Sequence, residues 1–245
     1  MPILEGQGVT KYFGGLAAVS NVDFHVDQGE IVGLIGPNGA GKTTLFNLIS
    51  AAFPISSGEM RFKGHKLNGL KPHKVCQMGI ARTFQETKVF ANMSVLQNVL
   101  VGAFFGSPNR VSVADATGEA TQALEFVGLT AMSATPVKDL TLINQKRTEV
   151  ARALATKPEL LLLDELMAGL TPAEVSETME MVTRIRDTGI TVFMVEHVMK
   201  AIMGICGRVI VLDYGEKIAE GTCQDIARDK KVIEIYLGEE SHAGS

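Results

Sequence analysis

Residues 36–44 read Gly-Pro-Asn-Gly-Ala-Gly-Lys-Thr-Thr, and this stretch constrains the chain more than any other. It fits the pattern of a glycine, four residues and then Gly-Lys-Ser/Thr that is typical of phosphate-binding loops. The apolar residues 31–35 before it predict a buried strand, and residues 44–49 after it predict a helix. We therefore expect backbone N–H groups of the loop to surround phosphate oxygens at the positive end of that helix.

The loop residues indicate how a nucleotide and a metal ion would be held. Lys42 is expected to reach the β- and γ-phosphates, and the Thr43 hydroxyl is expected to ligate Mg²⁺. One aromatic residue outside the loop, Phe13, is expected to stack on adenine. The predicted nucleotide-binding residues are Phe13, Gly36, Asn38, Gly39, Ala40, Gly41, Lys42, Thr43 and Thr44.

Two carboxylates follow a run of four leucines at residues 160–163. Such a run predicts a strand that is buried on both faces. Ligands of open parallel sheets lie beyond the carboxyl ends of the strands. We therefore expect Asp164 to hold Mg²⁺ through water, and Glu165 to orient or deprotonate the attacking water. The structural alternative, a solvated acidic turn, is disfavoured by the phosphate-binding loop in the same chain.

Two further polar residues end predicted strands. Gln85 ends residues 80–85, and His197 ends residues 192–197. Gln85 is expected to contact Mg²⁺ and the attacking water, and His197 the γ-phosphate and the same water. The predicted catalytic residues are thus Glu165, His197 and Gln85, and the predicted metal ligands are Thr43, Gln85 and Asp164.

Composition agrees with a nucleotide-binding protein. The chain of 245 residues is long enough for one large α/β domain. Its net charge of −4 gives no sign of a nucleic-acid partner. The three cysteines are scattered without metal-ligand spacing, which is typical of reduced cytosolic thiols. Neither a signal peptide nor a membrane span is expected, so a membrane role would come through a partner.

Strand and helix patterns alternate along the chain. Residues 1–30 and 58–64 predict an antiparallel sheet. Residues 86–157 are mostly helical in pattern, and residues 159–197 predict a strand, a helix and a strand, which implies parallel strands joined by crossover helices. We therefore expect an α/β fold, a P-loop NTPase core with a mostly parallel sheet, an antiparallel β subdomain and an inserted helical subdomain.

Together these motifs resemble the ATP-binding subunit of an ABC transporter. The loop 36–44 matches the Walker A motif, residues 160–165 the Walker B strand, Gln85 the Q-loop and His197 the switch histidine. Four further segments resemble the larger ATPase subunit of the high-affinity branched-chain amino acid (Liv-type) importer family: residues 10–15, 79–85, 196–204 and 232–238. A urea or short-chain amide importer of the same family would look almost the same.

This resemblance implies one ABC ATPase domain over residues 1–245. Residues 1–85 and 158–245 would form the nucleotide-binding core with its antiparallel β subdomain, and residues 86–157 the helical subdomain. ATP and Mg²⁺ are the implied cofactors, and ATP hydrolysis would energise import of branched-chain or related amino acids. The implied location is cytoplasmic, peripheral on the inner face of the plasma membrane.

The same resemblance implies several partners. They are a second ATP-binding subunit in a head-to-tail dimer, expected to be a heterodimer, two transmembrane permease subunits and, indirectly, a solute-binding protein. No nucleic acid is expected among them. The surface around residues 85–101 would form the groove that receives the permeases.

The signature segment departs from the family pattern, which is Leu-Ser-Gly-Gly-Gln or close to it. Residues 140–144 read Leu-Thr-Leu-Ile-Asn, with Ile143 in place of glycine and Asn144 in place of glutamine. We expect the β-branched Ile143 to block close backbone approach and to resist glycine-like dihedral angles. In the family this segment caps the γ-phosphate of ATP on the opposite subunit. Three interpretations stay open: a heterodimer with one weak site, an impaired subunit, or a nucleotide-dependent interaction subunit with little ATPase activity.

Overall fold

The computed structural model describes residues 1–86, 88–109 and 111–235. The chain divides into two compact units. The first comprises Met1–Lys71 and Thr191–Ser245, and the second comprises Pro72–Ile190. The end of segment 232–238, which contributed to the family resemblance, lies outside the described residues.

An antiparallel sheet forms the N-terminal part of the first unit, as the sequence predicts. Its strands run in the order β2-β1-β4-β5. Alternation along β2 places Val22, Phe24 and Val26 on the buried face. The strands are β1 (Pro2–Phe13), β2 (Leu16–Asp27), β4 (Ser57–Phe62) and β5 (His65–Lys66).

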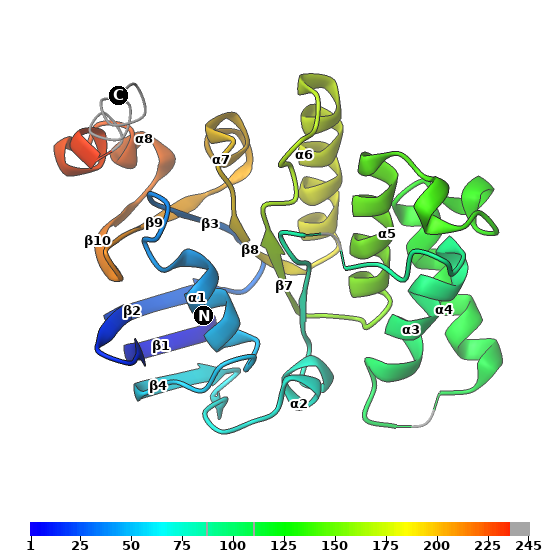
Figure 1. Cartoon of the computed structure of the whole chain (residues 1–245), viewed down its shortest axis with the longest axis horizontal. Helices are drawn as coiled ribbons and strands as arrows, with labels where there is room; N and C mark the ends of the chain where they lie inside the picture. Colours follow the sequence, from blue (N-terminus) through cyan, green and yellow to red (C-terminus); the bar gives the residue numbers. More distant parts are fainter. Residues whose placement is uncertain (87, 110, 236–245) are drawn as a thin grey trace. The chain divides into compact units, whose positions relative to one another are not determined.

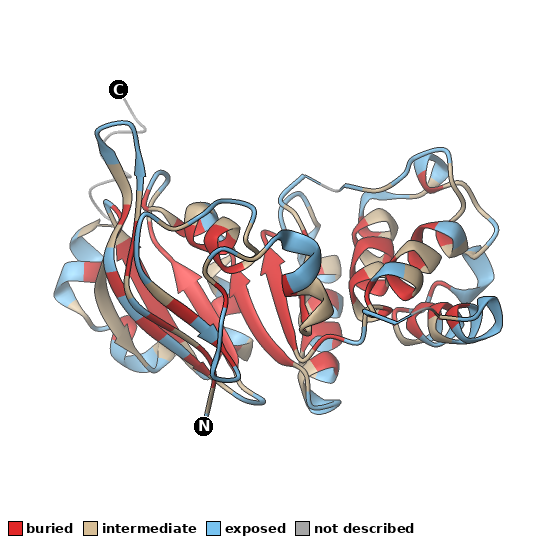
Figure 2. Cartoon of the chain, turned by 90° about the horizontal axis from the view of Figure 1, so that it is seen from below, coloured by how far each residue is buried: buried red, intermediate tan, exposed pale blue. Residues whose placement is uncertain are grey.

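A second sheet of the first unit carries the phosphate-binding loop. Its strands β10-β9-β3-β8 are β10 (Glu216–Gly221), β9 (Arg208–Asp213), β3 (Ile31–Ile35) and β8 (Thr191–Val195). Both β8 and β9 run parallel to β3, and β10 pairs antiparallel with β9. Every residue of β3 and β8 is buried, as the red strands in Figure 2 show. This burial explains why these strands are continuous apolar runs.

The helices of the first unit include α1 (Lys42–Ile49), α7 (Met199–Ile205) and α8 (Cys223–Ile226), and residues 230–235 are helical as well. The first of them packs an apolar face on the sheet. The Phe46 ring of α1 lies with its centroid 5.1 Å from that of Phe193 in β8. Because α1 starts directly after the phosphate-binding loop, this packing also fixes the loop.

The second unit combines a pair of parallel strands with helices. The strands β6 (Ile80–Arg82) and β7 (Leu160–Asp164) pair side by side. The helices are α2 (Pro72–Gln77), α3 (Val95–Phe105), α4 (Val113–Phe126), α5 (Leu142–Leu154) and α6 (Pro172–Asp187), with short 3₁₀ turns at Thr130–Met132 and Val137–Asp139. Helices α3, α4 and α5 pack against one another, as Figure 1 shows. Glycine at Gly102 permits this contact, because a Cβ there would lie 2.1 Å from the Arg152 carbonyl oxygen of α5.

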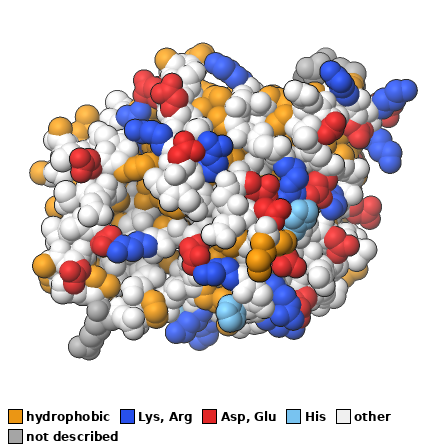
Figure 3. Space-filling model, turned by 180° about the vertical axis from the view of Figure 1, so that it is seen from behind, with side chains coloured by type: hydrophobic (Ala, Val, Ile, Leu, Met, Phe, Trp, Pro, Cys, Tyr) orange, Lys and Arg blue, Asp and Glu red, His pale blue; other side chains and the backbone are white. Residues whose placement is uncertain are grey.

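These elements confirm the α/β fold expected from the sequence, with two strands shorter than predicted. Strand β6 ends at Arg82 rather than Gln85, and β8 ends at Val195 rather than His197. Acidic and basic side chains lie intermixed on the face that Figure 3 shows, in keeping with the small net charge. Within the described part of the chain, no helix is both long and apolar enough to span a bilayer.

Candidate functional site

The phosphate-binding loop takes its shape from three glycines with positive φ. The φ angles are 150° at Gly36, 82° at Gly39 and 100° at Gly41. A Cβ on Gly36 would lie 2.0 Å from the Leu212 carbonyl oxygen, and a Cβ on Gly41 would lie 2.4 Å from that of Ala18. Only glycine permits this combination of dihedral angles and close backbone approach.

Lys42 begins α1, and its side chain turns back into the loop. Only 6% of Lys42 is exposed, and its Nζ donates to the carbonyl oxygens of Gly36 and Pro37 at 2.6 and 2.8 Å. Thr43 is exposed and Thr44 half-buried in the first turn of α1, while Asn38 is exposed in the loop. The ammonium group and the helix N-terminus make this loop a suitable site for phosphate.

The structure places His197 near the sheet edge from which the phosphate-binding loop starts. Strands β3 and β8 run parallel with Leu34 opposite Val195, so the chain leaves both strands at the same edge. His197 lies in a bend two residues beyond Val195 and is exposed, whereas Glu196 before it is buried. The phosphate-binding loop and His197 therefore follow the carboxyl ends of neighbouring strands of the same sheet.

Phe13 is the last residue of β1, and its side chain is 44% exposed. Its ring contacts the ring of Phe53 edge to face, with 5.4 Å between the centroids. The Nζ atom of Lys11 lies 5.0 Å from the centre of the Phe13 ring. Neither Phe53 nor Lys11 is predictable as a neighbour of Phe13, since nothing in the sequence pairs two segments so far apart.

In the second unit, Asp164 ends β7 and forms a buried ion pair. Nη2 of Arg82 donates to Oδ2 of Asp164 at 2.7 Å, and the two side chains are 6% and 1% exposed. The Asp164 N–H donates to Oγ1 of Thr83 at 3.2 Å. Both partners of Asp164 follow from the parallel pairing of β6 with β7. The sequence interpretation did not include Arg82 among the site residues. Its position as a charged residue at the end of an apolar strand was a signal that could have identified it.

Glu165 follows Asp164 with a φ of 49°, which is uncommon for a residue with a side chain. Nε2 of Gln85 donates to Oε2 of Glu165 at 2.9 Å. The buried Lys146 of α5 donates from Nζ to the Glu165 carbonyl oxygen at 3.2 Å. The structure thus brings two predicted catalytic residues, Gln85 and Glu165, into direct contact. The sequence carried no signal for Lys146, which occupies an ordinary helical position.

The altered signature segment forms the start of α5. Thr141 is the N-cap residue, and Ile143 lies in the first turn with 8% of its surface exposed. Ile143 is not among the described residues with positive φ, so no glycine-like dihedral angle is required of it. The outward-facing apolar side chain is that of Leu142, at 43% exposure. Within the unit the Ile143 side chain packs inward, and its expected effect on approach to ATP of the opposite subunit stays a prediction.

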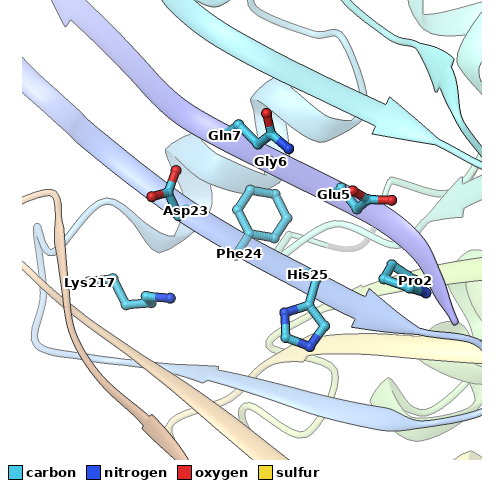
Figure 4. Close-up of a pocket in the computed structure, with 8 residues that line it drawn as sticks. All are labelled: Pro2, Glu5, Gly6, Gln7, Asp23, Phe24, His25 and Lys217. Atoms are coloured by element: carbon cyan, nitrogen blue, oxygen red, sulfur yellow. The ribbon is translucent and has the colours of Figure 1, made fainter.

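A pocket of about 320 Å³ lies on the antiparallel sheet of the first unit (Figure 4). None of the predicted site residues is among those that line it. Two of its charged side chains already have partners: Asp23 accepts from the Gly8 N–H at 2.6 Å, and Lys217 pairs with Glu220 at 2.7 Å. We assign no ligand to this pocket.

Comparisons with known proteins agree with this geometry. The family model described as ABC transporter matches residues 19–168, and the model described as branched-chain amino acid ATP-binding cassette transporter matches residues 216–242. The high-affinity branched-chain amino acid transport ATP-binding protein BraF of Pseudomonas aeruginosa is 37% identical over 97% of this chain and 98% of its own length. The corresponding LivG protein of Escherichia coli is 38% identical with the same coverage.

Solved structures resemble the chain over nearly its whole length. A crystal structure of the ADP conformation of an ATP-binding cassette of an ABC transporter has a TM-score of 0.89 and 30% identity, and covers 97% of this chain and 99% of its own. A nucleotide-free ATP-binding cassette has a TM-score of 0.88 and 29% identity. Fold and loop geometry thus define a P-loop nucleotide-binding protein of the α/β class. The chain belongs to the ABC transporter family, within which it is an ATP-binding cassette.

Proposed function

We propose that this chain is the ATP-hydrolysing subunit of an ABC importer for branched-chain amino acids. The observation that carries the proposal is full-length similarity to BraF and LivG, whose names specify this transport. The match of residues 216–242 to the branched-chain amino acid model supports the same solute class. Urea or a short-chain amide is the alternative solute.

The nucleotide contacts are assigned from the chemistry of each residue. Lys42 and the backbone N–H groups of the loop bind the phosphates, since the loop has the required positive end and close-packed glycines. Phe13 offers an exposed ring for stacking on adenine. The full proposed set comprises Phe13, Gly36, Asn38, Gly39, Ala40, Gly41, Lys42, Thr43 and Thr44.

Mg²⁺ is assigned to Thr43, Asp164 and Gln85. These residues supply hydroxyl, carboxylate and amide oxygens, the hard donors that Mg²⁺ prefers. The Asp164 carboxylate is buried and forms an ion pair with Arg82, so the protein already places one cationic group beside this oxygen ligand. Bound at these groups, Mg²⁺ would neutralise charge on the phosphate oxygens.

Hydrolysis is assigned to three side chains. Glu165 orients the attacking water and accepts its proton. Gln85 sets the direction of the Glu165 carboxylate through the 2.9 Å hydrogen bond. His197 is proposed to contact the γ-phosphate and the same water, in keeping with its place at the edge that carries the phosphate-binding loop.

The proposed partners are a second ATP-binding subunit, two permeases and, through them, a solute-binding protein. Attachment to the permeases would place the chain on the inner face of the plasma membrane. Within the expected docking segment 85–101, Phe90 is 49% exposed. Its backbone is fixed by the buried Asn98, which accepts from the Phe90 N–H at 2.8 Å and donates to its carbonyl oxygen at 3.1 Å. An exposed aromatic ring on a fixed backbone is suited to contact a permease.

Uptake by intact cells tests the proposal. Deleting the gene should abolish uptake of labelled leucine, and the parental gene should restore it whereas Lys42→Ala should not. Urea uptake, measured in the same strains, is expected to stay unchanged. Unchanged leucine uptake in the deletion strain would contradict the proposed solute, and loss of urea uptake instead would favour the alternative.

A second candidate function is a nucleotide-dependent interaction subunit with little ATPase activity. The altered residues 140–144 are the observation that favours it. ATP turnover of the purified chain, alone and with its partner ATPase subunit, separates the two candidates. The interaction subunit would bind ATP and leave turnover unchanged when Glu165 is replaced in the complex.

A further inference from the structure

Two large aromatic side chains stay exposed close to the helix that follows the phosphate-binding loop. Phe13 is 44% exposed and Phe53 is 39% exposed. Phe13 ends β1, and Phe53 lies four residues beyond the end of α1. With Lys11, these residues form what we call the Phe13 cluster, which lies entirely within the first unit.

The geometry of the cluster is specific. The two rings meet edge to face, with 5.4 Å between centroids and 82° between planes. Aromatic pairs favour this arrangement because the positive edge of one ring meets the negative face of the other. The Lys11 Nζ lies over the Phe13 ring at 5.0 Å from its centroid and 6.0 Å from that of Phe53. Both distances are within the range of a cation–π interaction.

Hydrogen bonds tie each neighbour of Phe13 in place. Lys11 Nζ donates to the Pro54 carbonyl oxygen at 2.8 Å, so the ammonium group cannot swing away without losing that bond. The Phe53 N–H donates to the Asn47 carbonyl oxygen of α1 at 3.2 Å. The loop that carries Phe53 is also fastened to β1, because Ser56 N–H donates to the Thr10 carbonyl oxygen at 2.8 Å.

We propose that Phe53 and Lys11 are positioning residues that hold the Phe13 ring for stacking on the adenine base. This inference rests on the proposed function of Phe13 as the adenine contact. Lys11 lies over the Phe13 ring and Phe53 meets that ring edge to face, so the two neighbours together restrict how the ring can turn. A ring that is oriented before ATP arrives loses less rotamer freedom on binding, and affinity rises accordingly.

A positioning role predicts different effects on binding of the nucleoside and of the phosphates of ATP. Phe53 and Lys11 act on Phe13, so replacing them weakens binding of the nucleoside and leaves binding of the phosphates unchanged. A merely structural role would lower stability, or would weaken all ligands of the loop equally. Tripolyphosphate, which lacks a base, is therefore the probe that distinguishes a positioning role from a structural one.

The experiment measures dissociation constants of the full-length chain for Mg-ATP and for Mg-tripolyphosphate by titration calorimetry. The variants are Phe13→Ala, Phe53→Leu, Lys11→Met and the double variant Phe13→Ala/Phe53→Leu. Phe105→Leu is the matched control, since Phe105 is also exposed, at 72%, but belongs to the second unit. Thermal unfolding of each variant confirms that it is folded, and Lys11→Met gives a second reading if Phe53→Leu folds poorly.

The expected losses in ATP affinity follow from the strength of each contact. Phe13→Ala should lose about 5–150-fold, as stacking of a base on an aromatic ring requires. Phe53→Leu should lose about 2–12-fold, and Lys11→Met about 2–5-fold. Tripolyphosphate affinity should not change, and Phe105→Leu should match the parent. The double variant should be no weaker than Phe13→Ala alone, because Phe53 acts through Phe13.

Three results would overturn the inference: parental ATP affinity in Phe53→Leu and Lys11→Met, an additive double variant, or an equal loss for tripolyphosphate. Each can occur while Phe13→Ala weakens ATP binding, which leaves the proposed function intact. Parental affinity in Phe13→Ala would remove the adenine contact itself and the inference with it. A parent that binds neither ligand would instead contradict the proposed ATP site.

Discussion

The side-chain amide of Gln85 donates to the carboxylate of Glu165, with 2.9 Å between Nε2 and Oε2. This bond joins the segment that follows β6 to the residue that follows β7, and it gives the carboxylate a defined direction. The backbone of Glu165 is fixed separately by Lys146. Glu165 is thus held at both its main chain and its side chain, as a residue that positions a water molecule needs to be.

Replacing Gln85 by alanine should slow ATP hydrolysis by about 10–100-fold, since a hydrogen bond to a charged group contributes about 1.5–3 kcal/mol. Binding of ATP in the absence of Mg²⁺ should change little, because Gln85 is not assigned to the nucleotide itself. The measurement is steady-state turnover of the assembled complex together with the dissociation constant for ATP. Gln77→Ala serves as the control, because Gln77 bonds only weakly to Ser107, at 3.5 Å. A parental turnover rate in Gln85→Ala would show that the hydrogen bond does not serve catalysis.

Lys42→Ala should weaken Mg-ATP binding by at least about tenfold, because a charged donor to the phosphates is lost. The matched control is Lys66→Ala, which removes an exposed ion pair with Glu59. Fluorescence titration with a labelled ATP analogue measures both. Undiminished affinity in Lys42→Ala would remove the phosphate-binding loop from the proposed site.

Arg82→Met should lower the free energy of unfolding by about 3–5 kcal/mol, because it leaves the buried Asp164 carboxylate without its cation. Arg147→Met, which breaks an ion pair with the exposed Glu177, should cost at most about 1 kcal/mol. Urea denaturation of the two variants provides the comparison. Equal losses would mean that burial of the Arg82–Asp164 pair does not govern its contribution.

Restoring the family residues in the signature segment should have two effects, one on hydrolysis and one on stability. Ile143→Gly with Asn144→Gln should raise hydrolysis at the site built on the partner's phosphate-binding loop, since a missing donor to a developing charge costs about 2.7–4 kcal/mol. Because Ile143 is buried in α5, the same variant should lose about 2–5 kcal/mol of stability. The effect on hydrolysis is measured below the unfolding temperature as turnover at a single site. One preparation has the partner's catalytic glutamate replaced, and the other has Glu165 replaced. Unchanged turnover at both sites would show that this segment does not limit hydrolysis.

Local patterns made much of this fold predictable. The alternation at Val22, Phe24 and Val26 fixed the buried face of β2, and the glycine spacing of the loop fixed its place between β3 and α1. The short helix α2 was missed, because six residues carry too little periodicity to distinguish a helix from a loop.

The unpredicted parts of the site depend on contacts between distant segments. Arg82 meets Asp164 only because β6 pairs with β7, and Phe53 meets Phe13 only because its loop is fastened to β1. The burial of Ile143 likewise depends on packing around α5, and neither composition nor family pattern specified which side chain of the segment would face inward.

The most direct test of ATP hydrolysis by this chain is turnover of the assembled transporter that contains Glu165→Gln. The amide is nearly isosteric with the carboxylate but cannot accept a proton from water. Turnover at the site of this chain should fall by about 10²–10⁴-fold, while ATP binding stays at the parental level. Glu177→Gln, at an exposed glutamate, is the control and should keep the parental rate. A complex with Glu165→Gln that hydrolyses ATP as fast as the parent would contradict the assignment of Glu165 and of the hydrolytic site.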